Sequence, residues 1–250
     1  MLAHAQRSEG KTDLLNYVLK LSDKRRSEII RTAWRVENAS EETEWLHMSN
    51  LQILRKTKNS PCICFGEYYI HCTETLRNNN VDSDEFKAAV LNALKFGRKK
   101  GNNIMIIGPA NCGKTFILKP LTDIFKCFVS PASETFAWVG AEKSEVVFLN
   151  DLRWNEKLIP WSDFLNLLEG LPIHLQAPKT HYSEDLLWER KTPIFATSST
   201  RLRKYDGGLL NDVETGMMET RWKYFEFTKP VDNPKEIKSC PCCFAHIVLS

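Results

Sequence analysis

An eight-residue segment, GPANCGKT, has the glycine, lysine and threonine spacing of a loop that binds a phosphate chain. The apolar run IMII precedes it and the helix-like run FILKPL follows it. In such a loop the backbone N–H groups bind phosphate oxygens, the lysine adds a positive charge, and the hydroxyl binds Mg²⁺. The segment predicts a nucleoside triphosphate site formed by Gly108, Pro109, Ala110, Asn111, Cys112, Gly113, Lys114 and Thr115.

A second candidate for this chemistry is the carboxylate of Asp151, which follows the apolar run EVVFL. A carboxylate at the tip of a strand beside the loop would hold Mg²⁺, partly through water, and would help to position the attacking water. The alternative is a solvated aspartate at a strand end. We expect Thr115 and Asp151 to share the Mg²⁺ ion.

The sequence around these residues predicts strands that alternate with helices. Apolar runs of strand length occur at IMII, FAWV, EVVFL, PIFAT and YFEF, separated by helix-like segments such as WSDFLNLLEG. Buried strands that alternate with helices favour a mainly parallel sheet, so we expect an α/β domain. Pro120 is expected to bend or shorten the helix that follows the loop.

The chain before this domain is expected to be mostly helical. In residues 81–97 an apolar stripe follows Asp82 and Glu85, which have capping-box spacing, and Gly97 can end the helix. We predict three parts: a mostly helical segment over 1–94, the α/β domain over 95–235, and a tail containing cysteine and histidine over 236–250.

Composition sets the class of protein but says little about partners. The 250 residues are 42% hydrophobic and 26% charged, which disfavours disorder, and the net charge of +3 is too small to indicate a partner. No run approaches the length of a membrane span and the N-terminus has no signal-peptide core, so we expect an intracellular protein without a membrane partner. The basic runs 24–26 and 98–100 are typical of solvated faces, with DNA contact or nuclear targeting as the alternative.

Segments in a fixed order resemble the superfamily 3 helicase domain. They are ALKFGRKKGNNIMIIGPANCGKT, VVFLND, TPIFATSST and METRWKYFEF. The likeness is closest to the parvovirus-type replication proteins (nonstructural or Rep proteins), or to an endogenised relative, and covers roughly residues 80–230. It implies an AAA+-like P-loop ATPase domain that uses ATP and Mg²⁺ and works as a ring, a hexamer, on single-stranded or forked DNA.

The resemblance also implies roles for individual residues. Asp151 matches the second of two adjacent acids in the family, but the first is Asn150 here, which leaves open the group that activates water. Ser199 stands where the family has an asparagine that senses the γ-phosphate. Arg221 matches the arginine finger that reaches the ATP of the neighbouring subunit.

The segment LEGLPIHLQAPKTHYSED resembles the family's hairpin, in which a basic loop grips the DNA backbone inside the ring. Lys179 and His181 fall at the matching positions. A mobile cation on a short loop can bind phosphates without reading bases. The alternative is an exposed lysine in a surface turn.

The eight cysteines are expected to be thiols or metal ligands, because an intracellular compartment is reducing. Cys240, Cys243 and His246 have zinc-like spacing, although one compact cluster rarely supplies four ligands. An earlier group could make another zinc site or share this one; it contains Cys62, Cys64, His71 and Cys72. Buried free thiols are the plainer interpretation.

The sequence therefore predicts an ATP-dependent DNA helicase or translocase that hydrolyses ATP between ring subunits. The pattern of a nicking domain is not seen, so nicking is expected from another domain or protein, and a nuclear location follows if the protein replicates a virus of a eukaryote. Two alternatives stay open. One is a nucleotide-binding assembly module, a domesticated viral remnant, favoured by Asn150 and Ser199; the other is a monomeric phosphoryl-transfer enzyme.

Overall fold

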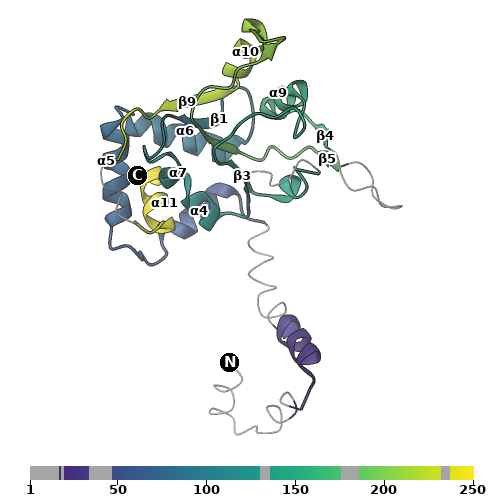
Figure 1. Ribbon diagram of the computed structural model, residues 1–250. Helices are drawn as coiled ribbons and strands as arrows, with labels where there is room; N and C mark the ends of the chain where they lie inside the picture. Colours follow the sequence, from purple (N-terminus) through teal and green to yellow (C-terminus); the bar gives the residue numbers. More distant parts are fainter. Residues whose placement is uncertain (1–16, 18–19, 34–46, 130–135, 176–185, 232–236) are drawn as a thin grey trace. The chain divides into compact units, whose positions relative to one another are not determined.

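The computed structural model describes residues 17, 20–33, 47–129, 136–175, 186–231 and 237–250. The chain divides into two compact units, 1–48 and 49–250. In the first unit, residues 23–33 form a helix. The second unit holds the remaining elements (Figure 1). The predicted boundaries at residues 94/95 and 235/236 stay a prediction.

The second unit is an α/β fold, as the sequence predicts. Its helices are α4 (Asn50–Lys58), α5 (Glu67–Asn78), α6 (Ser83–Phe96), α7 (Lys114–Leu118), α8 (Pro120–Ile124), α9 (Trp161–Glu169), α10 (Asp212–Glu219) and α11 (Pro241–Leu249), with a 3₁₀ turn η1 at Ala141–Lys143. Its strands are β1 (Asn103–Ile107), β2 (Cys127–Val129), β3 (Val146–Leu149), β4 (Ile173–Leu175), β5 (Leu186–Trp188), β6 (Ile194–Ser198), β7 (Tyr205–Asp206), β8 (Leu209–Leu210) and β9 (Trp222–Glu226).

The central sheet has five strands in the order β2-β3-β6-β1-β9, and every neighbouring pair is parallel. This confirms the predicted parallel sheet. Because the strands are parallel, the chain leaves β1, β3 and β6 at the same edge. The strand β6 lies between β1 and β3, so its final residues stand between the phosphate loop and the end of β3.

Helices and a hairpin cover the two faces of this sheet. Alternate residues of β1, Met105 and Ile107, belong to a core cluster with α9, and Trp188 of β5 joins them. On the other face, α6 packs on β1, and Phe86 of α6 meets Phe225 of β9 at 5.2 Å between ring centroids. Figure 1 shows α4, α5 and α11 gathered on one side and α9 with β4 and β5 on the other.

Local signals in the sequence explain the ends of α6. The Asp82 carboxylate accepts hydrogen bonds from the backbone N–H groups of Asp84 and Glu85, while the Glu85 carboxylate pairs with Lys223. At Gly97 the φ of +69° and the Lys191 carbonyl, 1.5 Å from where a Cβ would stand, admit only glycine. Both predicted ends of this helix are thus confirmed.

Pro120 divides the helical run after the loop into α7 and α8, as expected. Proline has no N–H with which to bond the carbonyl of Phe116, four residues earlier. The Tyr68 hydroxyl of α5 donates to that carbonyl at 3.0 Å and to the Ile117 carbonyl at 3.0 Å. A neighbouring helix therefore satisfies the backbone group that proline leaves open.

One predicted strand is wrong. Residues 136–139, FAWV, form a turn before η1 rather than a strand. Trp138 is buried all the same, stacks on Phe128 at 5.8 Å and donates its indole N–H to the Leu158 carbonyl at 3.0 Å. The aromatic side chains reach the core from a turn. A hydrophobic run shows that residues are buried, and here it did not show that they form a strand.

The C-terminal segment is a helix that packs inside the helical layer. Helix α11 contacts α4, α5, α6 and α8. Its buried residues are Cys242, Cys243, Phe244, Ala245, Ile247 and Val248. Across the described residues, each helix is too short or too polar to cross a membrane.

Candidate nucleotide site

The glycine-bounded loop joins β1 to α7 at the carboxyl edge of the sheet. Gly108 donates its N–H to the Ser198 carbonyl at 3.1 Å, and the next strand approaches so closely that a Cβ at Gly108 would stand 1.8 Å from the Phe227 carbonyl oxygen. Gly113 has φ +87°, and its Cβ would stand 2.8 Å from the Thr75 side chain of α5. Glycine is required at both ends because the backbone is packed tightly there.

Within the loop, Lys114 contacts backbone carbonyls and the tip residues are exposed. Lys114 Nζ donates to the Gly108 carbonyl at 2.7 Å and to the Pro109 carbonyl, so the ammonium lies across the loop. Pro109, Ala110 and Asn111 are exposed, whereas Cys112 is buried. The Cys112 thiol donates to the Pro109 carbonyl at 3.0 Å, which indicates a packing role.

Three polar side chains meet beside the loop, at the ends of β3 and β6. The Thr115 hydroxyl donates to Asn150 Oδ1 at 2.8 Å, and the Thr197 hydroxyl donates to the same oxygen at 3.0 Å. The Thr197 oxygen in turn accepts the N–H of Asp151 at 2.8 Å. Loop, β3 and β6 are therefore joined by one oxygen-rich cluster.

The residue nearest to Thr115 is not the acid that is predicted to share its Mg²⁺ ion. The residue in contact is Asn150, whereas Asp151 follows it with φ +52° and has a 62% exposed side chain that lies 3.6 Å from Arg153. Asn150 is the first residue after β3, so it faces the loop from the strand end. That Asp151 binds the metal stays a prediction.

Two other acids near β3 accept hydrogen bonds from backbone N–H groups. Glu145 is buried at the amino end of the strand and accepts the N–H of Lys126 at 2.8 Å, and Glu142 accepts the N–H of Gly140 at 2.8 Å. Because both lie before β3, they are on the opposite edge of the sheet from the phosphate loop.

The predicted sensor residue, Ser199, is not part of this cluster. Ser199 is exposed just after β6, while Thr197, inside the strand, contacts Asn150. Leu149 of β3 pairs with Ala196 of β6, so the residues that follow each of them, Asn150 and Thr197, are neighbours. This register is decided by how the strands pair, so the sequence alone gives no signal for Thr197, and a sensor role for Ser199 stays a prediction.

Beside this cluster a cavity of about 330 Å³ opens under the end of β3. Asn150 and Asp151 lie on its polar side. Its apolar lining includes Trp138, Leu149, Trp154, Leu158, Ile159 and Phe164. Because Phe164 belongs to α9, the cavity connects the nucleotide site with that helix.

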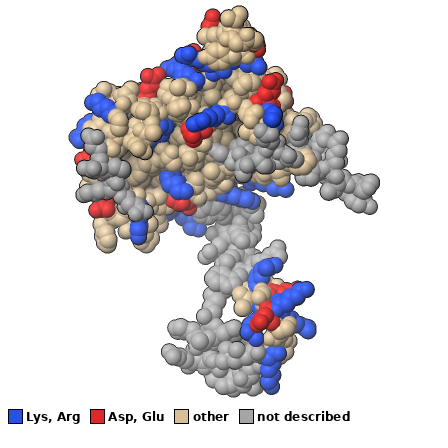
Figure 2. All heavy atoms as spheres, in the orientation of Figure 1, with Lys and Arg blue, Asp and Glu red and all other residues tan. Residues whose placement is uncertain are grey.

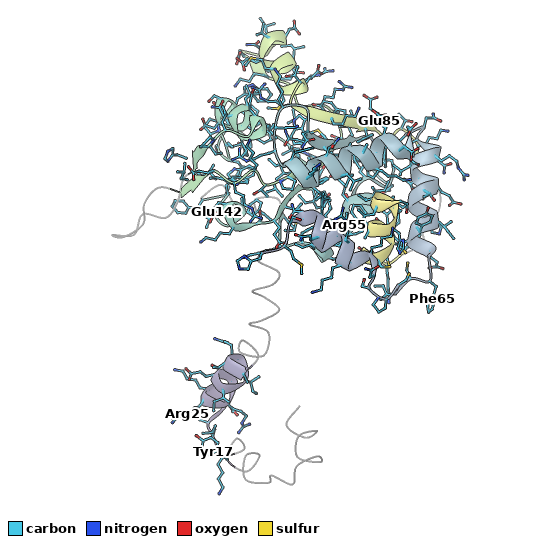
Figure 3. All side chains as sticks on the ribbon, turned by 180° about the vertical axis from the view of Figure 1, so that it is seen from behind. Tyr17, Arg25, Arg55, Phe65, Glu85 and Glu142 are labelled. Atoms are coloured by element: carbon cyan, nitrogen blue, oxygen red, sulfur yellow. The ribbon has the colours of Figure 1, made fainter. Side chains whose placement is uncertain are left out.

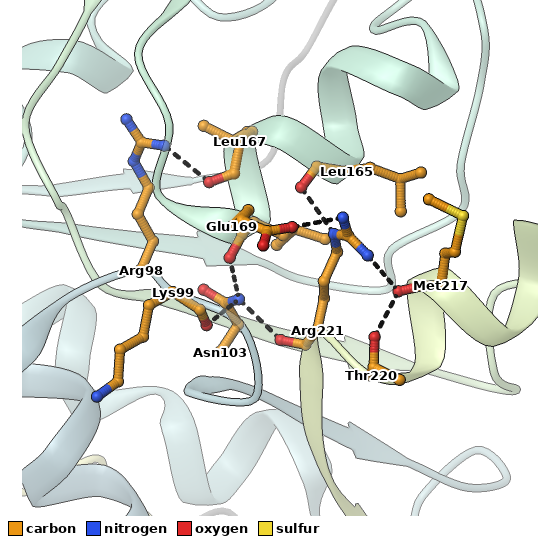
Figure 4. A network of polar contacts seen from close by, with 10 residues as sticks. Arg98, Lys99, Asn103, Leu165, Leu167, Glu169, Met217, Thr220 and Arg221 are labelled. Carbon is orange, nitrogen blue, oxygen red and sulfur yellow. Dashed lines mark hydrogen bonds and ion pairs between the residues drawn. The ribbon is translucent and has the colours of Figure 1, made fainter.

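Arg221 does not occupy the position that an arginine finger needs. Its side chain is only 7% exposed and pairs with Glu169 of α9 at 2.5 Å (Figure 4). It also donates to the carbonyls of Leu165, at 2.9 Å, and Met217, at 2.6 Å. The guanidinium thus binds α9 and α10 to β9 within its own chain, and the predicted role toward a neighbouring subunit is wrong for this structure.

Arg98 is likewise not part of a solvated basic face. It is fully buried after α6 and donates to four carbonyls, those of Leu167, Leu171, Trp188 and Arg190, at 2.7 to 3.0 Å. Burial lowers the pKa of Arg98 to about 10, so the side chain stays charged at neutral pH. Its planar fork holds the end of α9 and the base of β5 together.

Asn103 completes this buried network. Its side-chain amide donates to the carbonyls of Lys99, Leu168 and Arg221, and Figure 4 shows how it stands between the two arginines. The first residue of β1 therefore ties α9 and β9 to the strand that carries the phosphate loop.

The predicted DNA-contacting residues, Lys179 and His181, lie outside the described residues, in the segment 176–185. That segment joins β4 to β5, which pair antiparallel. On the face drawn in Figure 2, basic and acidic side chains are interspersed over the described part of the chain. The DNA contact stays a prediction.

The structure changes the predicted zinc set. Cys240 and Cys243 meet Cys62 and Cys64, whereas His246 is exposed and lies outside that group. Cys72 is buried on α5, where burial raises the pKa of its thiol to about 12, and His71 pairs with Glu74. The alternative in which the two cysteine groups share one site matches the geometry.

Comparisons with known proteins find similarity among solved structures alone. No protein-family model matches the chain, and no curated protein matches it. A JCV helicase, solved with a thiazolopyridinyl-phenoxyphenyl acetamide bound, aligns with a TM-score of 0.49 and 17% identity over 83% of this chain and 60% of its own. The C-terminal region of NrS-1 aligns with a TM-score of 0.43 and 12% identity over 73% of this chain and 42% of its own.

The chain thus spans less than two thirds of the length of each of these structures. Similarity at these TM-scores and identities does not determine an activity, so function has to be argued from the site.

Proposed function

We propose that this chain is an ATP-dependent motor domain of the superfamily 3 helicase type, which binds ATP on loop 108–115 and uses its hydrolysis to move single-stranded DNA. The observation that carries the proposal is the cluster of Thr115, Asn150 and Thr197 beside that loop. It joins the phosphate loop to two further strand ends, where a change at the γ-phosphate can be detected by the rest of the fold.

The residues present fit a nucleotide with its magnesium ion. The loop backbone is open to solvent at its tip, glycine stands at both ends, and Lys114 is at hand to replace its loop contacts by phosphate oxygens. Mg²⁺ favours oxygen ligands, and Thr115 and Asn150 offer two at one point, with Asp151 next along the chain. When bound, the ion would neutralise charge on the phosphates.

The same fold offers a route from the nucleotide to the predicted DNA loop. The segment after β3 lines the cavity that reaches Phe164 of α9, and α9 packs on β4. Arg98 fixes the end of α9 to the base of β5. We infer that the nucleotide state shifts α9 and, with it, β4 and β5, the two strands that flank the predicted DNA-contacting segment with Lys179 and His181.

Assembly into a ring, a hexamer in this proposal, would place several such hairpins around one strand. Since Arg221 is bound within its own chain, the proposal includes no finger from that residue. A nicking domain or protein as partner and work in the nucleus stay predictions from the sequence resemblance.

The proposal is tested by steady-state ATP hydrolysis with and without single-stranded DNA. Lys114→Ala is expected to lower the rate on the order of 10²-fold, because it removes the positive charge that stabilises the transferred phosphate. Lys119→Ala is the matched control, since Lys119 is an exposed lysine between α7 and α8. Equal rates for Lys114→Ala and the unmodified chain, or no stimulation by DNA, would contradict a motor; mass in solution with ATP and DNA reports the ring.

Asn150 favours a second candidate, a nucleotide-binding assembly module that hydrolyses ATP slowly. The side chain in contact with Thr115 is a neutral amide, whereas the helicase family that the sequence resembles has an acid at this position. An amide oxygen can bind a metal ion but brings no negative charge to neutralise it. Under this candidate Asn150→Asp should raise the hydrolysis rate roughly 10-fold, the lower end of metal-site effects. Nucleotide binding should persist in the unmodified chain, and an Asn150→Asp rate at or below that of the unmodified chain rejects this candidate.

A further inference from the structure

Four cysteine thiols from segments far apart in the sequence meet at one point of the helical layer. The sulfur of Cys62 lies 3.7 Å from that of Cys64, 3.9 Å from that of Cys240 and 3.5 Å from that of Cys243. The sulfurs of Cys64 and Cys243 are 3.4 Å apart, and all four lie within 4.8 Å of one another.

These separations match the edges of a metal-centred tetrahedron. With a zinc–sulfur distance of about 2.3 Å, the sulfurs of a tetrahedral site stand about 3.8 Å apart. A disulfide needs about 2.05 Å between its sulfurs, and all eight cysteines of the chain are free thiols. The four sulfur atoms are therefore spaced as ligands of one ion rather than as two bonded pairs.

We propose that Cys62, Cys64, Cys240 and Cys243 bind one structural Zn²⁺ ion. Each thiol gives up its proton on binding, so that four thiolates surround the ion and no position is left for water or substrate. Such a closed site stabilises the fold without taking part in hydrolysis.

The local chain is shaped to present these ligands. After Cys64 the backbone turns through Phe65 at φ +51° and Gly66 at φ +87°, and the Phe65 side chain is 97% exposed at the outer end of this loop (Figure 3). A left-handed phenylalanine is strained, and such strain persists only where surrounding contacts impose it. Metal bonds to the two preceding cysteines would supply that constraint.

The second pair of ligands comes from the start of α11. Cys240 is the residue before the helix, Pro241 begins it, and Cys243 follows one turn later on the same face. Cys242 is excluded, because its thiol donates to the Lys58 carbonyl at 3.6 Å. One ion would thus join α11 to the loop that precedes α5.

This connection reaches the phosphate loop through α5. Tyr68 of α5 bonds the carbonyls of Phe116 and Ile117 in α7, and Thr75 packs against Gly113. At the other end of α5, Asn79 accepts the N–H groups of Thr228 and Lys229, next to the segment that packs on Gly108. The metal would therefore stabilise the helix that supports both sides of the loop.

The experiment measures metal content of the full chain, purified under reducing conditions after growth with zinc and dialysed without chelator. We expect about one Zn²⁺ per chain, lost in Cys62→Ser and Cys243→Ser and kept in Cys242→Ser, the matched control on the same helix. Replacement by Co²⁺ in the unmodified chain should give the absorption of a tetrahedral thiolate site, a readout that needs no variant to fold.

A folded chain without zinc, a chain that carries iron instead, or disulfides among these cysteines in mass spectrometry would each overturn the proposal. Loss of zinc from Cys242→Ser together with the ligand variants would also overturn the assigned ligand set. Neither metal content nor the Co²⁺ spectrum depends on ATP, so failure here is separate from failure of the proposed motor.

Discussion

Positively charged residues have different roles in this chain, and burial separates them. Lys114 lies across an open loop where phosphates can replace its carbonyl partners, whereas Arg221 and Arg98 are buried and donate to several backbone carbonyls. A charge buried with its partners costs free energy when one partner is removed, while an exposed charge costs little. The arginines are thus structural and the lysine is available for chemistry.

Arg221→Ala should destabilise the fold rather than affect a neighbouring subunit alone. The change removes the ion-pair partner of Glu169 and one donor to each of the Leu165 and Met217 carbonyls. We expect a cost of about 3 kcal/mol, the low end for buried pairs, because Glu169 is partly exposed. Denaturant unfolding measures the change in free energy. Arg201→Ala is the control: Arg201 pairs with Glu226 near the surface, and its loss should cost less than about 1 kcal/mol.

An experiment with mixed subunits can contradict this structural role of Arg221. If Arg221→Ala folds as stably as the unmodified chain, and mixing it with Lys114→Ala restores ATP hydrolysis, the arginine acts between subunits and the structural role is rejected.

At the scale of elements, side chains bond the backbone groups that the helices near the site leave open at their ends or at a proline. Pro120 interrupts the run after the loop, and Tyr68 of α5 bonds the open carbonyl. Helix α6 begins at the Asp82 carboxylate, and α9 ends on the Arg98 guanidinium. The loop is thus held both by its own hydrogen bonds and by contacts from α5, from β6 and from the residue that follows β9.

The cap of α6 predicts a pH effect with a defined sign. Hydrogen bonds from the N–H groups of Glu85 and Asp84 hold the pKa of Asp82 below its ordinary value. The charged cap therefore stabilises the fold above the unfolded pKa of aspartate, about 3.9, and this contribution is lost as pH falls through the lower folded value. Asp82→Asn keeps an acceptor that does not titrate.

Thermal unfolding of both proteins across acidic pH checks this expectation. The difference in Tm between the unmodified chain and Asp82→Asn should stay constant from neutral pH down to about 4 and should shrink below it. A difference that stays constant throughout the acid range, or that grows on acidification, would show that the carboxylate does not stabilise the cap.

At the scale of the whole second unit, helix α11 completes a core that helices of residues 50–96 begin. Helix α11 packs on α4, α5 and α6, and its cysteines meet those of the loop before α5. If Zn²⁺ occupies that cluster, a chelator should lower the Tm and, because α5 supports the loop, should also weaken nucleotide binding.

The effect of zinc on nucleotide binding is measured with a fluorescent ATP analogue before chelation, after chelation and after zinc is added back. Unchanged affinity in a zinc-depleted chain would show that α5 holds the loop without the metal.

The sequence by itself determined the features that depend on neighbours along the chain. The glycine-bounded turn between β1 and α7, the strands β1, β3, β6 and β9, the ends of α6 and the break at Pro120 follow from spacing, apolar runs, capping residues and proline. These are local signals, since backbone geometry and hydrophobic periodicity act over a few residues.

Only the tertiary structure decided which side chains face one another. It brought Asn150 and Thr197, rather than Asp151 and Ser199, to Thr115, since strand register selects the residue that faces the loop. It buried Arg221 and Arg98 against carbonyls of α9, and it joined Cys62 and Cys64 to cysteines at the far end of the chain. Contacts across such separations depend on how helices and strands pack, and no local pattern in the sequence encodes them.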